Sequence, residues 1–262
     1  MRTGRVAYGG AIHECTPRDG DSLRLADGRV LNESEVVWLP PLEARTIFAL
    51  ALNYADHAAE LAAKSSAEQS RFLQAQRTEP IVFLKAENTL IGHRGLTRRP
   101  AEAEFMHYEC ELAVVIGREG KRISRQHAMD HVAGYTVAND YAIRNFLEPY
   151  YRPNLRVKSR DGCTALGPWF VPRDEIPDPT DLRLSTHVNG TLVQEGNTRD
   201  MIHDVPSLIE FLSGFMTLSP GDVILTGTPK GSVDVKPGDE VLCEVDGVGS
   251  LRNHVVRDWI PA

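Results

Sequence analysis

The alternation of apolar and polar positions predicts a chain built mainly of β-strands. Runs rich in β-branched and other apolar residues recur along the chain and are divided by Gly, Pro and Asp turns. Before Pro40 and Pro41 these runs are short. The later runs are longer, at "PIVFLKA", "ELAVVIG", "VAGYTVAND", "DVILTGTP", "DEVLCEVDGVGSL" and "NHVVRDWI". The pattern predicts a small N-terminal β appendage over residues 1–45 and a larger domain over residues 46–262.

Helices are expected in only a few segments. Residues 55–76 are rich in Ala, Glu, Gln and Leu, which favours an exposed polar helix that is interrupted near Ser65 and Ser66. Further helices are predicted around residues 124–132 and within residues 204–216. Because strands outnumber helices without a regular βαβ alternation, the predicted fold class is α+β, mainly β, rather than a doubly wound sheet.

Charge and composition narrow the range of partners. The formal net charge is −7 and no basic block stands out, which argues against a nucleic-acid or membrane-surface partner. The four cysteines are scattered and form no CxxC pair. No apolar run approaches the ~20 residues of a spanning helix, and the N-terminus lacks the apolar segment of a signal peptide. We therefore expect a cytoplasmic protein that acts on a small molecule.

Two glutamates stand one residue apart at the start of a buried-looking strand, in "HYECELAVVIG". Residues two apart in a strand point to the same face, ~6.6 to 7 Å apart along the chain, so Glu109 and Glu111 can aim at one point while Cys110 faces away. Two carboxylates in a partly dry site repel unless a pKa rises or a cation binds. Oxygen ligands favour Mg²⁺, with Mn²⁺ or Ca²⁺ as alternatives. The competing interpretation is an acidic pair on a solvated strand face.

A third carboxylate follows in "GYTVANDYAIRNF", which is predicted to be a strand that ends at Asp140 and continues into a helix. Asp140 can complete a three-carboxylate site. Arg144, four residues later, would lie on the same helix face and offer its guanidinium to a substrate carboxylate. The alternative is an N-capping Asp140 with Arg144 as its partner.

Two further segments carry chemistry that is compatible with an anionic substrate. "RVKSRDGC" contains Arg156, Lys158 and Arg160, of which a lysine near a metal can act as an electrophile or a proton carrier. "ILTGTPKGS" offers backbone N–H groups and the Thr228 hydroxyl to a carboxylate, although it lacks the Walker spacing. A solvated basic loop is the alternative for the first segment, and the second is a weak signal.

An acid/base pair is predicted in "LNYADHAAEL". His57 and Glu60 are three residues apart on the predicted polar helix, so the carboxylate can orient the imidazole. A surface His-Glu pair is the alternative. His107, beside the acidic pair, competes for the catalytic role or has a structural one.

Eight blocks, in order from about residue 46 to the end, resemble the fumarylacetoacetate hydrolase family: "NYADHAAE", "FLKAENTL", "HYECELAVVIG", "VAGYTVANDYAIR", "VKSRDGCTALGPW", "VNGTLVQEGNTRDMIHDVPSLIEFLS", "LSPGDVILTGTPKG" and "GDEVLCEVDGVGSLRN". The resemblance implies a mixed β-sandwich roll with a helical lid segment. It also implies a homodimer or higher homo-oligomer, or pairing with a paralogous partner half. The family's metal carboxylates match Glu109, Glu111 and Asp140, its lid dyad and active-site lysine match His57, Glu60 and Lys158, and its substrate contacts match Arg144 and Thr228.

Within that family, residues 139–172 look most like the decarboxylase and isomerase branch that acts in 4-hydroxyphenylacetate degradation. This resemblance implies Mg²⁺-dependent loss of CO₂ from 5-oxopent-3-ene-1,2,5-tricarboxylate, isomerisation of 2-hydroxyhepta-2,4-dienedioate, or both. Hydrolytic members tend to carry glutamine seven residues after the metal aspartate, where this chain has Leu147. The alternatives are a C–C bond hydrolase of acylpyruvates or fumarylacetoacetate-like diketo acids and, less favoured, a non-catalytic metal-binding protein.

Overall fold

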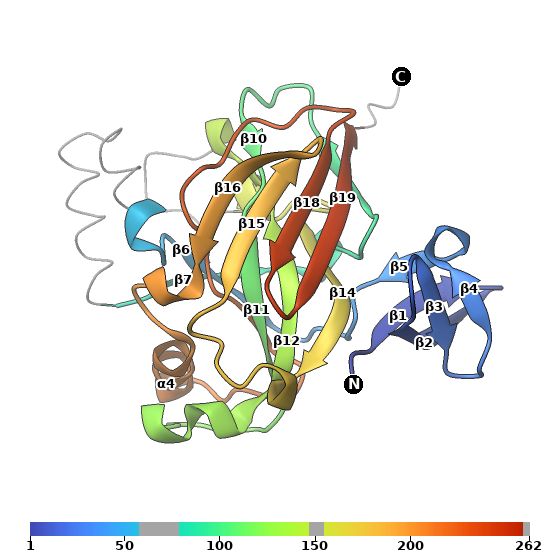
Figure 1. Cartoon of the computed structure of the whole chain (residues 1–262). Coiled ribbons are helices and arrows are strands. Elements are labelled where there is room, and N and C mark those ends of the chain that lie inside the picture. Colours follow the sequence, from blue (N-terminus) through green and yellow to red (C-terminus); the bar gives the residue numbers. More distant parts are fainter. Residues whose placement is uncertain (58–78, 147–154, 259–262) are drawn as a thin grey trace.

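Three large β-sheets with few helices form the architecture of the computed structural model, which describes residues 1–57, 79–146 and 155–258 (Figure 1). The expectation of a mainly β, α+β fold is confirmed. No helix within these ranges is long and apolar enough to cross a membrane.

The central sheet has seven strands in the order β7-β6-β17-β11-β12-β14-β8. It is mixed, because β17 pairs with β6 and β14 pairs with β8 in parallel, whereas the other pairings are antiparallel. Its strands are β6 (Ile47–Ala51), β7 (Ile81–Lys85), β8 (Leu90–Ile91), β11 (Cys110–Ile116), β12 (Val132–Asp140), β14 (Thr164–Pro172) and β17 (Val223–Leu225).

A second sheet of five strands packs on one face of the central sheet, in front of β11 and β12 in Figure 1. Leu112 and Val114 of β11 join Leu184, Val241 and other residues of the second sheet in the main apolar core. The strands, in the order β16-β15-β18-β19-β9, are β9 (Leu96–Arg99), β15 (Arg183–Val188), β16 (Thr191–Asn197), β18 (Glu240–Val245) and β19 (Gly249–Arg257).

The burial of both faces of β11 explains the continuous apolar run in this part of the sequence. All seven of its residues are buried, since its two faces are covered by different clusters. Cys110, Leu112 and Val114 belong to the core against the second sheet, and Ala113 belongs to a smaller cluster on the opposite face. Glu111 alternates with Cys110 and therefore lies on the side away from the second sheet.

A third sheet is formed by the N-terminal residues, in the order β4-β3-β2-β1-β5, with its own small apolar cluster around Val6 and Trp38. It contacts the central sheet through Trp38. The Trp38 ring packs edge to face against that of Trp169 in β14, with 5.0 Å between the ring centroids. A boundary at residue 45 between two domains stays a prediction. The strands are β1 (Gly4–Tyr8), β2 (Ala11–Pro17), β3 (Ser22–Leu25), β4 (Val30–Asn32) and β5 (Val37–Leu39).

The helices partly match expectation. The predicted helix within 204–216 is α4 (Val205–Phe215), whose Asp204 cap accepts a hydrogen bond from the Ser207 N–H. The segment around 124–132 is a 3₁₀ helix rather than an α-helix. Of the predicted helix 55–76, residues 55–57 are helical and residues 58–76 lie outside the described ranges. The remaining short helices are α3 (Leu155–Lys158), η1 (Glu33–Glu35), η2 (Glu87–Thr89), η3 (Arg125–His131), η4 (Arg144–Phe146), η5 (Arg173–Glu175) and η6 (Thr198–Asp200).

A two-stranded antiparallel sheet is formed by β10 (Met106–His107) and β13 (Ala142–Ile143).

Strands β12 and β14 approach each other so closely that position 134 requires glycine. A Cβ at Gly134 would overlap the Val171 carbonyl oxygen and press on the Phe170 ring. We expect Gly134→Ala to lower the free energy of unfolding by roughly 1 to 3 kcal/mol, as overpacking does elsewhere. The measurement is urea unfolding followed by fluorescence.

Gly214→Ala is the matched control, because a Cβ at this exposed position of α4 meets nothing within 4 Å. Replacing glycine in a helix should raise the free energy of unfolding by about 0.5 to 1 kcal/mol. Equal effects of the two substitutions would show that the β12–β14 contact is not what requires glycine.

Candidate metal centre

The carboxylates of Glu109, Glu111 and Asp140 converge. Each offers an oxygen atom, and these oxygens lie within 4.8 Å of one another. The three residues are 6%, 0% and 1% exposed, so the alternative of a solvated strand face is wrong. The structure therefore brings together the three residues that the sequence proposed as metal ligands.

The register of β11 and β12 explains this convergence. Cys110 is paired with Asn139 across the two antiparallel strands, which sets Glu109 beside Asp140. The Asp140 N–H donates to the Glu109 carbonyl, and the Glu109 N–H donates to the Asn139 side chain. The thiol of Cys110 points the other way, toward the Glu244 carbonyl of β18.

Two buried lysines neutralise part of this negative charge. Lys158, in α3, has its Nζ 2.5 Å from Glu109 Oε2 and 2.9 Å from Asp140 Oδ2. Lys85, the last residue of β7, has its Nζ 2.6 Å from Asp140 Oδ1 and also donates to the Lys158 carbonyl. Lys85 was not predicted from the sequence. A lysine closing the apolar run "IVFLK" was the signal that could have found it.

Glu111 has a different environment. The Gly227 N–H donates to its Oε2 at 2.6 Å, but no hydrogen-bond partner for Oε1 is found among the described residues. Burial, followed by repulsion from Asp140 and Glu109, raises the pKa of Glu111 well above its ordinary value. A buried carboxylate oxygen with no partner, close to two other carboxylates, has the donor chemistry of a hard divalent cation. The residues therefore fit such an ion.

Neighbouring charges shift the pKa values of Glu109 and Lys158. Burial alone would raise the pKa of Glu109, but Lys158 and Arg144 outweigh burial and the pKa is lowered to about 2. Burial opposes the charge of the Lys158 amine, but the three carboxylates outweigh it and raise its pKa. Lys158 is therefore an ammonium, which suits a proton donor or a fixed positive charge rather than a nucleophile.

The expected helical turn from Asp140 to Arg144 is wrong. Strand β13 and then η4 follow Asp140, so the two side chains do not form an i, i+4 pair and Asp140 does not cap a helix. The Arg144 Nε donates instead to His107 Nε2 at 2.7 Å, and its Nη2 lies 3.4 Å from Glu109 Oε1. Arg144 still reaches the carboxylate cluster, by a different route.

The Gly-rich segment after β17 holds a carboxylate, but it is the protein's own Glu111 rather than a substrate group. Thr228 is 4% exposed, and its hydroxyl oxygen accepts from Gln194 Nε2 at 3.1 Å. The hydroxyl hydrogen can therefore be donated to another acceptor.

His57 is buried, at 4% exposure, and its backbone N–H donates to Asp56 Oδ1 at 2.7 Å. Its proposed partner Glu60, the lid segment and Leu147 lie outside the described residues. Asn53 was not predicted from the sequence either. Its Nδ2 donates to the carbonyls of His203 and Thr226, and its Oδ1 accepts from the His203 N–H, which ties the turn before His57 to the end of β17.

The three cations of "RVKSR" do not act together. Only Lys158 points to the carboxylates among these three. Arg156 and Arg160 lie over the Phe146 ring, at 4.8 and 5.8 Å from its centroid, and Arg160 also pairs with Asp258.

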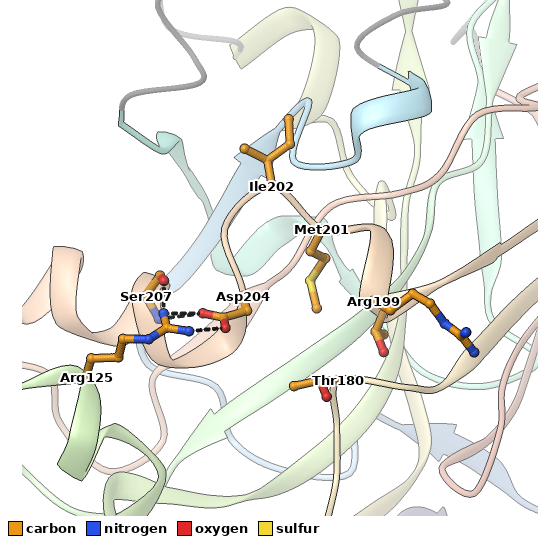
Figure 2. A pocket seen from close by; sticks show the side chains of 8 residues that line it. Arg125, Thr180, Arg199, Met201, Ile202, Asp204 and Ser207 are labelled. Atoms are coloured by element: carbon orange, nitrogen blue, oxygen red, sulfur yellow. Dashed lines mark hydrogen bonds and ion pairs between the residues drawn. The ribbon is translucent and has the colours of Figure 1, made fainter.

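A separate hollow of about 340 Å³ lies at the start of α4 and contains none of the predicted site residues (Figure 2). The Arg125 guanidinium points at both oxygens of Asp204, and Arg199 pairs with Asp181. Because both arginines are neutralised by carboxylates, this hollow has no evident affinity for an anion.

Comparison with known proteins places this geometry in a family. Residues 46–256 match the family model described as fumarylacetoacetate (FAA) hydrolase C-terminal. The chain belongs to the fumarylacetoacetate hydrolase family. The match covers all eight sequence blocks, and the family's mixed β-sandwich fold agrees with the two packed sheets.

Three relatives at 53% identity or more all carry the same activity in their names. The chain is 53% identical over 253 residues to the 4-hydroxyphenylacetate degradation bifunctional isomerase/decarboxylase of Salmonella dublin, covering 91% of this chain and 56% of that protein. It spans about half the length of the curated relatives that carry this activity in their names.

Solved structures of the family superpose along the whole chain. The 5-carboxymethyl-2-hydroxymuconate delta-isomerase of Mycobacterium smegmatis is 35% identical with a TM-score of 0.81, covering 99% of this chain and 100% of that one. The maleylpyruvate hydrolase of Sphingobium sp. SYK-6, in complex with manganese(II) and pyruvate, is 26% identical with a TM-score of 0.80 at the same coverage.

The raised pKa of Glu111 predicts how the stability of the metal-free protein depends on pH. A carboxyl whose pKa rises on folding binds its proton more tightly in the folded state, so stability falls as pH rises from about 4.3 toward the raised value. In chelator, the Glu111 carboxyl should therefore make the free energy of unfolding of the wild type fall as the pH is raised above about 4.3, at a slope of up to about 1.4 kcal/mol per pH unit. Glu111→Gln should remove this fall.

Comparison of the wild type with Glu111→Gln isolates the contribution of Glu111. The pKa of Glu109 is lowered to about 2, mainly by Lys158 acting against burial, and burial lowers the pKa of His93 and His107 to about 3. These groups contribute to the pH dependence of the wild type and of Glu111→Gln alike, so the difference between the two profiles reports Glu111. Parallel stability profiles for the wild type and Glu111→Gln would contradict the raised pKa.

Proposed function

We propose that this chain is a divalent-metal-dependent enzyme, with Mg²⁺ as the ion, that decarboxylates 5-oxopent-3-ene-1,2,5-tricarboxylate, isomerises 2-hydroxyhepta-2,4-dienedioate, or does both. The observation that carries the metal dependence is the convergence of three buried carboxylates, which offer oxygens within 4.8 Å of one another, together with a Glu111 Oε1 that has no hydrogen-bond partner among the described residues. The choice of reaction is supported by the relatives named isomerase/decarboxylase, at 53% identity or more.

Glu109, Glu111 and Asp140 would hold the ion, which supplies a Lewis acid that polarises the keto group of a 2-oxo acid. Mn²⁺ and Ca²⁺ satisfy the same oxygen ligands. The two buried lysines support the site by forming ion pairs that hold the carboxylates of Glu109 and Asp140 in place.

Cationic side chains of the protein would stabilise the negative charge that develops in the substrate. When CO₂ leaves, the electron pair of the broken C–C bond enters the conjugated 2-oxo system, where a proton must then be added. Lys158, held as an ammonium, can stabilise that charge or donate the proton. Arg144 and Thr228 have donors that suit the remaining carboxylates.

Proton transfer during isomerisation is assigned to His57, with Glu60 as its orienting partner. His57 is buried and its turn is fixed by Asn53, so its position relative to β17 is well defined. We propose that the segment carrying Glu60 closes over the substrate and excludes water, as lids do in other enzymes. A homodimer or higher assembly, or a paralogous partner half, remains part of this proposal.

The first experiment is CO₂ release and ultraviolet absorbance with the tricarboxylate substrate, in excess Mg²⁺ and in excess chelator. We expect CO₂ release that requires the metal. Glu111→Gln should lower kcat/KM by at least about a hundredfold, because a metal ligand is lost. Glu14→Gln, at an exposed position of β2, is the matched control and should behave as the wild type.

Other outcomes discriminate between the alternatives. Activity on the dienol alone, without CO₂ release, would restrict the chain to isomerisation. Oxygen from labelled water in a new product carboxylate, with an acylpyruvate as substrate, would favour a hydrolase. Activity that is unchanged in chelator would overturn the metal-dependent proposal.

A further inference from the structure

His107 is a buried imidazole with both of its nitrogens engaged. Its Nδ1 lies 2.9 Å from the Tyr108 carbonyl oxygen, which can only accept, so Nδ1 carries the hydrogen. Its Nε2 then has a free lone pair, and this accepts from the Arg144 Nε at 2.7 Å. A ring that donates through Nδ1 and accepts through Nε2 is the neutral tautomer.

This arrangement excludes the usual functions of an active-site histidine. An imidazole bonded through both nitrogens to protein groups has no lone pair to offer a metal ion and no nitrogen that faces a substrate. The function of His107 must therefore act through the group that it holds, which is Arg144.

Backbone pairing fixes the two residues relative to each other. His107 pairs with Ala142 across β10 and β13, and the Arg144 N–H donates to the Phe105 carbonyl at 2.9 Å. The His107 ring thus meets Arg144 at its Nε, the atom nearest the side-chain stem, and sets the direction of the guanidinium plane.

The outer donors of Arg144 remain available. Its Nη2 makes only a long contact, 3.4 Å, with Glu109 Oε1, and no contact of Nη1 is found within the described part of the chain. The Arg144 side chain is 27% exposed, whereas that of His107 is fully buried. Two terminal nitrogens at the edge of the carboxylate cluster, neither of them in a short hydrogen bond within the described residues, match the two oxygens of a ligand carboxylate.

We propose that His107 is a positioning residue that aims Arg144 at the distal carboxylate of a dicarboxylic 2-oxo acid. This inference rests on the proposed function, in which the 2-oxo acid end of the substrate lies at Glu109, Glu111 and Asp140. His107 then contributes to selection between substrates with and without a second carboxylate, and not to the chemical step.

The test compares two ligands on Mg²⁺-loaded protein by calorimetry: pyruvate, which lacks a distal carboxylate, and 2-oxoadipate, which has one. We expect His107→Leu to weaken 2-oxoadipate about tenfold while pyruvate binding changes by less than about twofold, since one charge-assisted contact loses its alignment. In His107→Gln the amide oxygen can replace Nε2 as acceptor, so this variant should recover most of the selectivity.

A double-mutant cycle shows whether His107 acts through Arg144. Adding His107→Leu to Arg144→Met should produce no further loss of 2-oxoadipate affinity. His93→Leu is the matched control. His93 is also a buried histidine with a pKa lowered to about 3 by burial, but its ring accepts from the Arg252 N–H and is T-stacked on Trp38. This variant should lose stability and keep the ligand ratio.

The outcomes separate this inference from the proposed function. A wild type that binds no Mg²⁺ in the same calorimeter overturns the proposed function, and the inference with it. A wild type that binds Mg²⁺ and prefers 2-oxoadipate, with His107→Leu weakening both ligands equally or adding to Arg144→Met, overturns the inference alone.

Discussion

Three carboxylates, from Glu109, Glu111 and Asp140, meet in a region that excludes most water, and each charge there must be matched by a cation or a proton. The central sheet supplies these partners from distant parts of the sequence. The pairing of β11 with β12 brings the acids together, the end of β7 contributes Lys85, and the segment after β17 contributes the Gly227 N–H. The sheet order therefore matters to the site as much as the identity of the acids does.

The two lysines are distributed unequally over the three carboxylates, and this distribution determines which carboxylate lacks a cationic partner. Lys158 contacts Glu109 and Asp140, and Lys85 contacts Asp140 again, whereas neither lysine contacts Glu111. Glu111 is thus the carboxylate that gains most from a divalent ion, and without the ion it gains most from a proton. In the proposed metal site, a metal ion and a proton would compete for the Glu111 carboxylate, which would couple metal binding to pH through one residue.

The sequence predicted most of what depends on local pattern. Strand alternation set Glu109 and Glu111 on one face with Cys110 on the other, and the capped apolar run predicted α4. It did not predict the contacts of Arg144, because a helical turn was assumed where β13 pairs with β10, and that pairing is a long-range event. Lys85 and Asn53 were missed for the same reason. Lys85 is 55 residues from Asp140, and Asn53 is 150 or more residues from the carbonyl groups that it binds. Sequence spacing relates only residues that are near one another in the chain.

The charge state of Lys158 limits which residues can take part in proton transfer. An ammonium whose pKa is raised by three carboxylates can donate a proton or stabilise an anion, but it does not remove a proton from carbon near neutral pH. His107 is excluded because both of its nitrogens bond to protein groups. Of these three candidates within the described part of the chain, His57 is then the group with the right chemistry to accept a proton. Proton transfer in the proposed isomerisation therefore falls to His57, whose turn is held by the hydrogen bonds of Asn53.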